Sequence, residues 1–275
     1  MKKLTISTLV SLAALSNMSF AQSVSVDLKT PTINELGLTL STYSYKEPSL
    51  SVQMDATNIG VEYQGTYAFK NNWFVLGEID YNTGKVKYSG TGTQSGIPQY
   101  YFNLKAAVGY DFAFDKFVLS PYVGLGYRYL SQQWGGTQTS TGAYGYDRQS
   151  TYNYLPIGVI HRFAAGSKSL IETNFEYDYL MSGNQMSGLG ALNGRGGLSG
   201  LSDVNNAQKS GYGLNLSVMY KEDSWGVGPY WKYWNIKNSE TAGGTFTYNG
   251  TTYRATWYEP ANNTNEFGIK VIYRF

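Results

Sequence analysis

Most of this chain alternates apolar and polar residues with a period of two, the pattern of β-strands with one apolar and one polar face. The last residues show it most clearly, with Ile272 as the one exception. Similar segments fill most of the chain from residue 35 onward and predict about ten strands. The apolar face of the last segment consists of Phe267, Ile269, Val271, Tyr273 and Phe275.

The predicted connections between these strands alternate in length. Tight turns are expected near residues 70–72, 114–116, 165–167 and 222–224. Longer loops are expected near residues 47–55, 89–98, 132–148, 182–208 and 237–260. Short turns on one side and long loops on the other are typical of bacterial outer-membrane barrels, with the turns in the periplasm. Because the expected strand number is even, both termini are expected in the periplasm.

The terminal segment EFGIKVIYRF, residues 266–275, resembles the C-terminal signal strand of bacterial outer-membrane β-barrels. In that family, the outer-membrane assembly machinery reads a strand that ends on phenylalanine behind alternating apolar residues. The resemblance implies that this chain is located in the bacterial outer membrane and that Phe267, Ile269, Val271, Tyr273 and Phe275 are its assembly signal. The chain looks like the small barrels of the OmpA/OmpX and opacity-adhesin group.

A sheet that spans a membrane must close, because an open edge in lipid leaves backbone groups without hydrogen bonds. The predicted fold is therefore all-β, a closed antiparallel up-and-down transmembrane β-barrel over residues 35–275. A soluble, lipocalin-like barrel would place its apolar face inside. Here the bulky Tyr, Trp, Leu and Val residues share one face of nearly every strand and the charges share the other, which favours lipid outside.

The N-terminus has the features of a secretory signal peptide. Lys2 and Lys3 precede an apolar run that ends before Ser19-Phe20-Ala21, so we expect residues 1–21 to be removed on export. Residues 22–34 are expected to form a periplasmic lead-in. Loss of Lys2 and Lys3 reduces the 21 basic residues to the number of acidic ones, 19, and no basic run suggests nucleic acid. The chain has no cysteine, which excludes thiol chemistry and disulfides, whereas its 26 tyrosines suit membrane-interface belts.

Charges of both signs occupy the polar faces of the predicted strands and would line the lumen. Buried charges are costly unless they are paired, and a ten-stranded barrel is only slightly wider than the size that side chains can fill. A lumen plugged by ion pairs is therefore favoured, with a thin polar channel as the alternative. The lumen-facing candidates are Glu62, Glu78, Asp80, Lys105, Asp111, Arg128, Arg162, Glu172, Glu176, Asp178, Lys232, Lys270 and Arg274.

Ten strands also resemble the omptin proteases, which use an Asp pair and an Asp–His pair at the extracellular rim. The single histidine, His161, is expected near the periplasmic end of its strand and on the outer face, so it does not fit that role or the role of histidine in lipid-modifying barrel enzymes. Carboxylates two residues apart, such as Glu78 and Asp80, could act in acid–base chemistry, but alternate residues of any polar lumen share a face. No catalytic residue, metal site or cofactor is predicted.

The pattern as a whole favours a non-enzymatic outer-membrane barrel with a structural or adhesin-like role at the cell surface. Its long loops are rich in Tyr, Asn, Gly and Ser, the composition of adaptable binding surfaces, and include Tyr144, Tyr146, Tyr248 and Tyr253. A narrow pore for ions or small polar solutes is the alternative, and an omptin-like or lipid-modifying enzyme comes third. The expected partners are outer-membrane lipid and lipopolysaccharide, the outer-membrane assembly machinery and an unidentified extracellular ligand.

Overall fold

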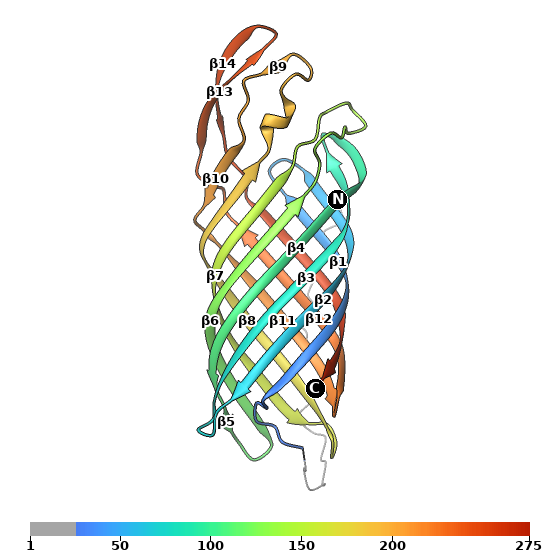
Figure 1. Ribbon diagram of the computed structural model, residues 1–275, viewed down its shortest axis with the longest axis vertical. Helices are drawn as coiled ribbons and strands as arrows, with labels where there is room; N and C mark the ends of the chain where they lie inside the picture. Colours follow the sequence, from blue (N-terminus) through green and yellow to red (C-terminus); the bar gives the residue numbers. More distant parts are fainter. Residues whose placement is uncertain (1–25) are drawn as a thin grey trace, which may run out of the picture.

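The computed structural model describes residues 26–275, so the expected leader, residues 1–21, lies outside the described residues. Ten strands form one closed antiparallel barrel, which confirms the predicted fold (Figure 1). Each barrel strand pairs with the next one along the chain. These strands are β1 (Ile33–Glu47), β2 (Val52–Ala68), β3 (Trp73–Gly90), β4 (Gly92–Tyr110), β6 (Phe117–Gln132), β7 (Arg148–Ala164), β8 (Ser169–Ser187), β11 (Gly211–Glu222), β12 (Trp225–Ile236) and β15 (Asn262–Arg274).

The barrel closes between its first and last strands. β1 and β15 pair from Glu35 opposite Arg274 to Lys46 opposite Asn263. The backbone N–H of Phe275 donates to the carbonyl of Asn34 at 2.9 Å. We call this end of the barrel, where the short connections also lie, the turn end, and the opposite end the loop end. Closure satisfies the backbone hydrogen bonds that an open sheet edge would leave unpaired.

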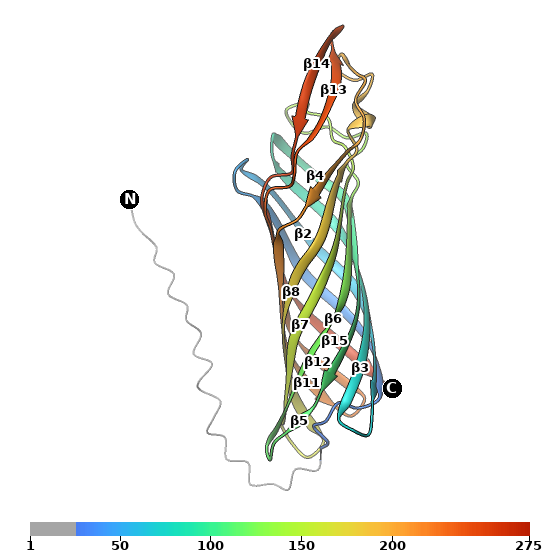
Figure 2. The same ribbon diagram turned by 90° about the vertical axis from the view of Figure 1, so that its left-hand side faces the viewer.

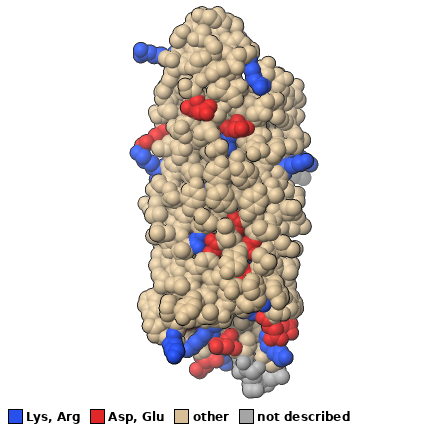
Figure 3. Space-filling model, viewed as in Figure 1, with Lys and Arg blue, Asp and Glu red and all other residues tan. Residues whose placement is uncertain are grey.

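The middle of the outer wall is apolar. Leu38 is 65% exposed and Leu125 63% exposed, although both are large apolar side chains. Charges gather toward the two ends of the molecule, with a broad band between them that is interrupted by one small charged patch (Figure 3). Aromatic pairs mark both margins of this band, Trp73–Tyr110, Tyr220–Trp225 and Tyr273–Phe275 toward the turn end and Tyr81–Tyr100, Tyr212–Tyr233 and Trp231–Tyr233 toward the loop end. No helix among the described residues is long and apolar enough to cross a membrane.

The prediction of a loop at residues 89–98 is wrong, because β3 and β4 continue through these residues. Only Thr91 lies between them. Val86 pairs with Ile97 and Lys87 pairs with Ser95, so Gly96 is an extra residue in β4, and its φ of 81° suits a glycine bulge. The loop at 47–55 is likewise shorter than expected, since β2 begins at Val52. The barrel wall therefore continues well beyond the apolar band at the loop end.

The loops expected at 182–208 and 237–260 are largely ordered and form what we call the crown. β10 (Val204–Gln208) pairs with β8, and a separate sheet has the order β14-β13-β9. Figures 1 and 2 show the crown standing above the loop end rather than entering the lumen. Its other elements are η2 (Leu189–Leu192), β9 (Leu198–Ser199), β13 (Ala242–Tyr248) and β14 (Thr251–Trp257), while the short β5 (Phe112–Ala113) lies at the turn end.

The prediction that apolar residues face outward is incomplete, because apolar and aromatic residues also pack inside the barrel. Glycines of the wall make room for some of these rings. A Cβ added to Gly126 would lie 2.1 Å from the ring of Tyr154, and one added to Gly158 would lie 2.3 Å from the ring of Tyr122. The buried clusters are Tyr43, Tyr45, Met54, Val86, Ile97 and Trp134; Phe74, Leu76, Ala107, Tyr122 and Ile160; and Tyr152, Tyr154, Leu180, Trp234 and Ile236.

Candidate functional site

A chain of alternating charges crosses the lumen near the turn end. Lys221 Nζ lies 2.9 Å from Glu35 Oε1 and 2.9 Å from Glu172 Oε1. Arg162 Nε donates to Glu172 Oε2 at 2.6 Å, and Arg274 Nε donates to Glu35 Oε1 at 3.0 Å. These residues come from β1, β7, β8, β11 and β15, so the series of ion pairs links the strands from β7 round to β1.

The segment before β1 adds hydrogen bonds to this turn-end network. The Thr30 N–H donates to Asp111 Oδ2 at 2.7 Å, and the Thr30 hydroxyl donates to Asp111 Oδ1 at 2.8 Å. Arg162 Nη1 donates to the Thr30 hydroxyl at 2.9 Å. Thr30 is only 6% exposed. The described part of the expected lead-in, residues 26–34, therefore packs against the turn end of the lumen through Thr30, and its last two residues belong to β1.

A second cluster of charges occupies the middle of the lumen. Lys105 Nζ lies 3.1 Å from Glu78 Oε2 and 3.0 Å from Glu176 Oε2. The Asn215 amide donates to Glu176 at 2.9 Å and to Asp178 Oδ2 at 2.7 Å. Asp178 Oδ1 receives no hydrogen bond from the described residues. One lysine thus bridges two carboxylates, and an amide cross-links the acidic pair Glu176 and Asp178.

A neighbouring network surrounds Asp80. Lys232 Nζ lies 3.1 Å from Asp80 Oδ2, and the Asn103 amide donates to Asp80 Oδ1 at 2.8 Å. Arg128 Nη1 donates to the Asn103 carbonyl oxygen at 3.2 Å, and its guanidinium lies 4.2 Å from the centre of the Tyr101 ring. The carboxylate, the amide and the stacked arginine thus form one network that links β3, β4 and β6.

All of the charged residues that the sequence suggested as lumen-facing lie inside the barrel in the structure. Each of them has a polar partner. Glu62 pairs with Lys270, which completes the set. Buried charges that are paired and hydrogen-bonded avoid the cost of an isolated charge. The described charges therefore form cross-links between strands rather than a row of free side chains along a channel.

The spaces left between these side chains are small. Two lumen cavities of about 60 Å³ and 50 Å³ are lined by the ion pairs of Glu78 and Lys105, and a third of about 10 Å³ lies beside Arg128 and Trp234. A buried water needs about 10–15 Å³ of such space. These cavities suit single waters or small groups of waters.

A further cluster lies under the crown, at the loop end. Arg148 Nη1 lies 3.1 Å from Glu47 Oε1, and Arg148 Nη2 pairs with Glu259. The Tyr45 hydroxyl contacts both carboxylates, at 2.7 Å for Glu47 and 3.1 Å for Glu259. Burial raises the pKa of the Glu259 carboxyl above its usual range, although Arg148 acts in the opposite direction. This cluster ties the base of the crown to β1 and β7.

Several residues of these networks were not among the sequence candidates. Glu35, Lys221 and Glu266 occupy polar positions of the alternation, so the same reasoning could have included them. Glu266 accepts hydrogen bonds from Ser41 at 3.0 Å and from Tyr230 at 2.9 Å. The alternation of polar and apolar residues does not indicate the cluster under the crown, because Glu47, Arg148 and Glu259 lie at strand ends or in a loop.

The single histidine lies on the outer wall near the turn end. The His161 ring centre is 5.5 Å from that of Phe117 and 5.4 Å from that of Phe163, within the aromatic belt. Among residues 26–275 there is no group of three or more His, Cys, Asp or Glu residues arranged to hold a metal ion. The structure therefore separates His161 from the acidic clusters of the lumen and of the loop end.

Comparisons with known proteins agree on the architecture. The sequence model of a family described as "Outer membrane protein beta-barrel domain" matches residues 7–194, whereas no curated protein matches the chain. The outer membrane protease OmpT from Escherichia coli has a TM-score of 0.56 at 10% identity, with 92% of this chain and 100% of that chain covered. At this identity the likeness concerns the fold alone.

Two further solved barrels are less similar. An outer membrane channel from Pseudomonas putida F1 has a TM-score of 0.43 at 11% identity, covering 92% of this chain and 100% of that chain. The attachment invasion locus protein Ail of Yersinia pestis has a TM-score of 0.34 at 11% identity, covering 90% and 100%. Neither similarity is strong enough to carry a functional argument.

Proposed function

Because the chain belongs to the outer-membrane β-barrel domain family and is a bacterial outer-membrane protein, we propose that its lumen is closed and that its extracellular crown binds a partner at the cell surface. The turn end is then periplasmic and the loop end extracellular. The proposed role is non-enzymatic and adhesin-like.

The observation that carries this proposal is the folded, aromatic crown. Tyr248 and Tyr253, on β13 and β14, are each 45% exposed, and the ring of Phe246 stacks on that of Tyr253 at 5.5 Å. The Asn249 N–H donates to the carbonyl of Gly197 at 3.0 Å, which fastens this hairpin to the neighbouring crown segment. Tyrosine provides a large contact area at low entropic cost, and an ordered hairpin reduces the ordering cost of binding.

The packing of the lumen argues against the alternative of a pore. Cross-links such as Lys105 on β4 with Glu176 on β8 join strands that are not neighbours, and the apolar clusters pack above and below the charges. The described cavities are the size of single waters or small groups of waters, which is small for the passage of hydrated ions.

The position of the histidine argues against the omptin-like alternative. His161 is the only histidine of the chain and lies at the periplasmic end, on the lipid-facing wall. At the extracellular end, the buried carboxylates of Glu47 and Glu259 are held by Arg148 instead of facing a histidine. A water-activating Asp–His pair cannot form there from these residues.

The test uses cells that display the full-length protein and immobilised fibronectin, collagen and mucin glycans as probes. We expect binding to at least one probe, with a loss of about tenfold or more when Tyr248→Ser and Tyr253→Ser remove two exposed contact residues. Phe114→Ser is the matched control, because Phe114 is 52% exposed but lies at a periplasmic turn. Binding that survives both crown substitutions would contradict the proposal, as would no binding to any probe by correctly displayed protein.

A further inference from the structure

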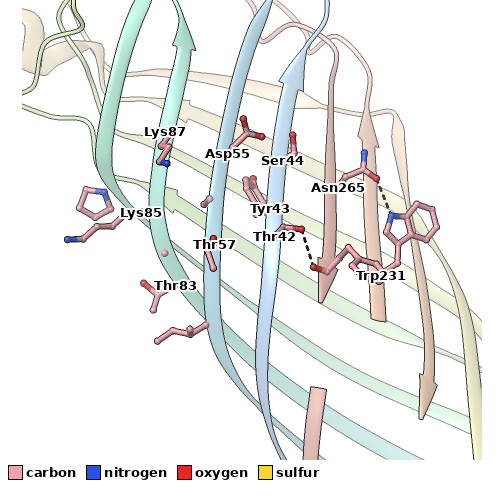
Figure 4. Close-up of a pocket in the computed structure, with 15 residues that line it drawn as sticks. Thr42, Tyr43, Ser44, Asp55, Thr57, Thr83, Lys85, Lys87, Trp231 and Asn265 are labelled. Atoms are coloured by element: carbon pink, nitrogen blue, oxygen red, sulfur yellow. Dashed lines mark hydrogen bonds between the residues drawn. The ribbon is translucent and has the colours of Figure 1, made fainter. Parts of the chain in front are cut away.

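The outer wall contains a groove at its extracellular margin, apart from the crown. It crosses β1, β2 and β3 and reaches β12 and β15, with a volume of about 930 Å³. Figure 4 shows short hydroxyl side chains lying between Lys85 on one side and Trp231 on the other. The groove exists because small residues form its floor between these long side chains, namely Thr42, Ser44, Thr57 and Thr83.

The membrane-facing margin of the groove is apolar. Ile59 and Phe267 line it and are 62% and 59% exposed. Trp231 stacks on Tyr233 at 5.8 Å within the extracellular aromatic belt. These residues continue the apolar band of the barrel, so this margin meets the acyl chains of the outer leaflet.

The opposite margin is basic. Lys85 and Lys87 occupy successive outward positions of β3, about 7 Å apart along the strand. Lys85 follows the belt residue Tyr81 by four positions, about 13 Å along a tilted strand. The headgroup layer extends about 5–8 Å beyond the hydrocarbon on each side. Long lysine side chains at this height reach the lipid headgroups.

The charges of the groove favour an anionic ligand. Among the described residues, neither Lys85 nor Lys87 has an ion-pair partner, whereas Lys105 and Lys221 in the lumen are paired. Asp55 lies opposite Lys87 in the β2–β3 register and accepts a hydrogen bond from the Gln53 amide at 2.7 Å. Two exposed ammonium groups therefore face one carboxylate in the groove.

We propose that this groove binds a phosphorylated lipid of the outer leaflet. Its phosphate lies between Lys85 and Lys87, its polar headgroup contacts the hydroxyls of Ser44 and Thr57, and its acyl chains run down over Ile59 and Phe267. A lipid fits better than a second copy of the chain, because a symmetric contact through this face would bring like charges together. This site is independent of the binding proposed for the crown.

The test is native mass spectrometry of the refolded protein with diphosphoryl lipid A. We expect retention of this lipid by the wild type and at least a tenfold loss of affinity in the variant K85E/K87E. The variant K85R/K87R keeps both charges and should retain binding. The control K70E/K116E makes the same charge change at the exposed periplasmic turns and should bind like the wild type. Heat-modifiable mobility on gels establishes that each variant is folded, and K85Q/K87Q replaces the charge reversal if that variant fails to fold.

The outcomes separate the possible occupants of the groove. Equal binding of chemically dephosphorylated lipid A would overturn the proposal, because the lysines would then not recognise phosphate. Equal losses in K85E/K87E and K70E/K116E would indicate non-specific charge attraction and would also overturn it. A dimer that persists without lipid and dissociates in K85E/K87E would assign the groove to a second copy of the chain instead.

Discussion

Lys105 shows how a single residue cross-links the interior of this barrel. Its side chain is 8% exposed and contacts two carboxylates, of which Glu176 is 3% exposed. Among the described residues Lys105 is the ion-pair partner of both carboxylates, and Glu176 also accepts hydrogen bonds from Tyr122 and Asn215. A buried ion pair adds little net stability compared with an apolar packing, but removal of one partner leaves an uncompensated charge. The contribution of the network to stability is therefore measured best by removing one charged partner, which lowers the free energy of unfolding.

Lys105→Met should strongly destabilise the folded barrel. It leaves Glu78 and Glu176 without their cation, and loss of one partner of a buried pair costs about 3–5 kcal/mol in the free energy of unfolding. Urea unfolding of the refolded protein in lipid vesicles measures this change. Lys116→Met, at an exposed turn, is the control and should alter the free energy by less than about 0.5 kcal/mol. A change of similar size in both variants would mean that the lumen is solvated and the network has little effect.

At the scale of elements, the alternation of residues predicted the barrel strands and their inner charges well, because lipid outside and polar groups inside impose a period of two. It failed where the barrel leaves the membrane. Residues 89–98 are rich in Gly, Ser and Thr and suggest a loop, yet pairing across the bulge at Gly96 makes them the end of β3 and the beginning of β4. Val86 and Ile97 pack inward there, and only the folded structure reveals their partners.

The fold of the crown could not be predicted from the sequence either, because it depends on pairing between distant segments. β13 and β14 pair with each other above the barrel, and β13 also pairs with β9, so their order depends on contacts between distant segments. The cluster of Glu47, Arg148 and Glu259 likewise joins a strand end, a strand start and a loop. Alternation within one strand contains no information about such pairings.

The terminal strand allows a separate prediction about assembly. The Phe275 side chain is 59% exposed, and Phe275 bonds to Asn34 through backbone atoms only. Phe275→Ala should therefore leave the urea stability of refolded protein nearly unchanged but reduce severalfold the amount assembled in the outer membrane of cells. Quantitative gels of membrane fractions, with Phe114→Ala as the exposed aromatic control, measure the assembled amount. Equal assembly of the two variants would argue against a signal role for the terminal phenylalanine.

At the scale of the whole molecule, polar interactions are divided among three regions with different roles. The lumen is filled by ion pairs and rings and holds the walls together. The crown presents exposed tyrosines above the membrane, and the lateral groove presents Lys85 and Lys87 at headgroup height. A shared barrel fold does not determine function. We therefore propose that function resides at the outer surfaces and that the lumen has a structural role.

The most direct test of a closed lumen is the single-channel conductance of refolded residues 22–275 in a planar lipid bilayer. We expect no discrete conductance steps from folded wild-type protein. A variant with Tyr101→Ala and Trp234→Ala, which removes buried rings from two levels of the lumen, serves as the positive control and should produce steps. Reproducible, concentration-dependent steps from the wild type would contradict a closed lumen and would identify the lumen as a pore.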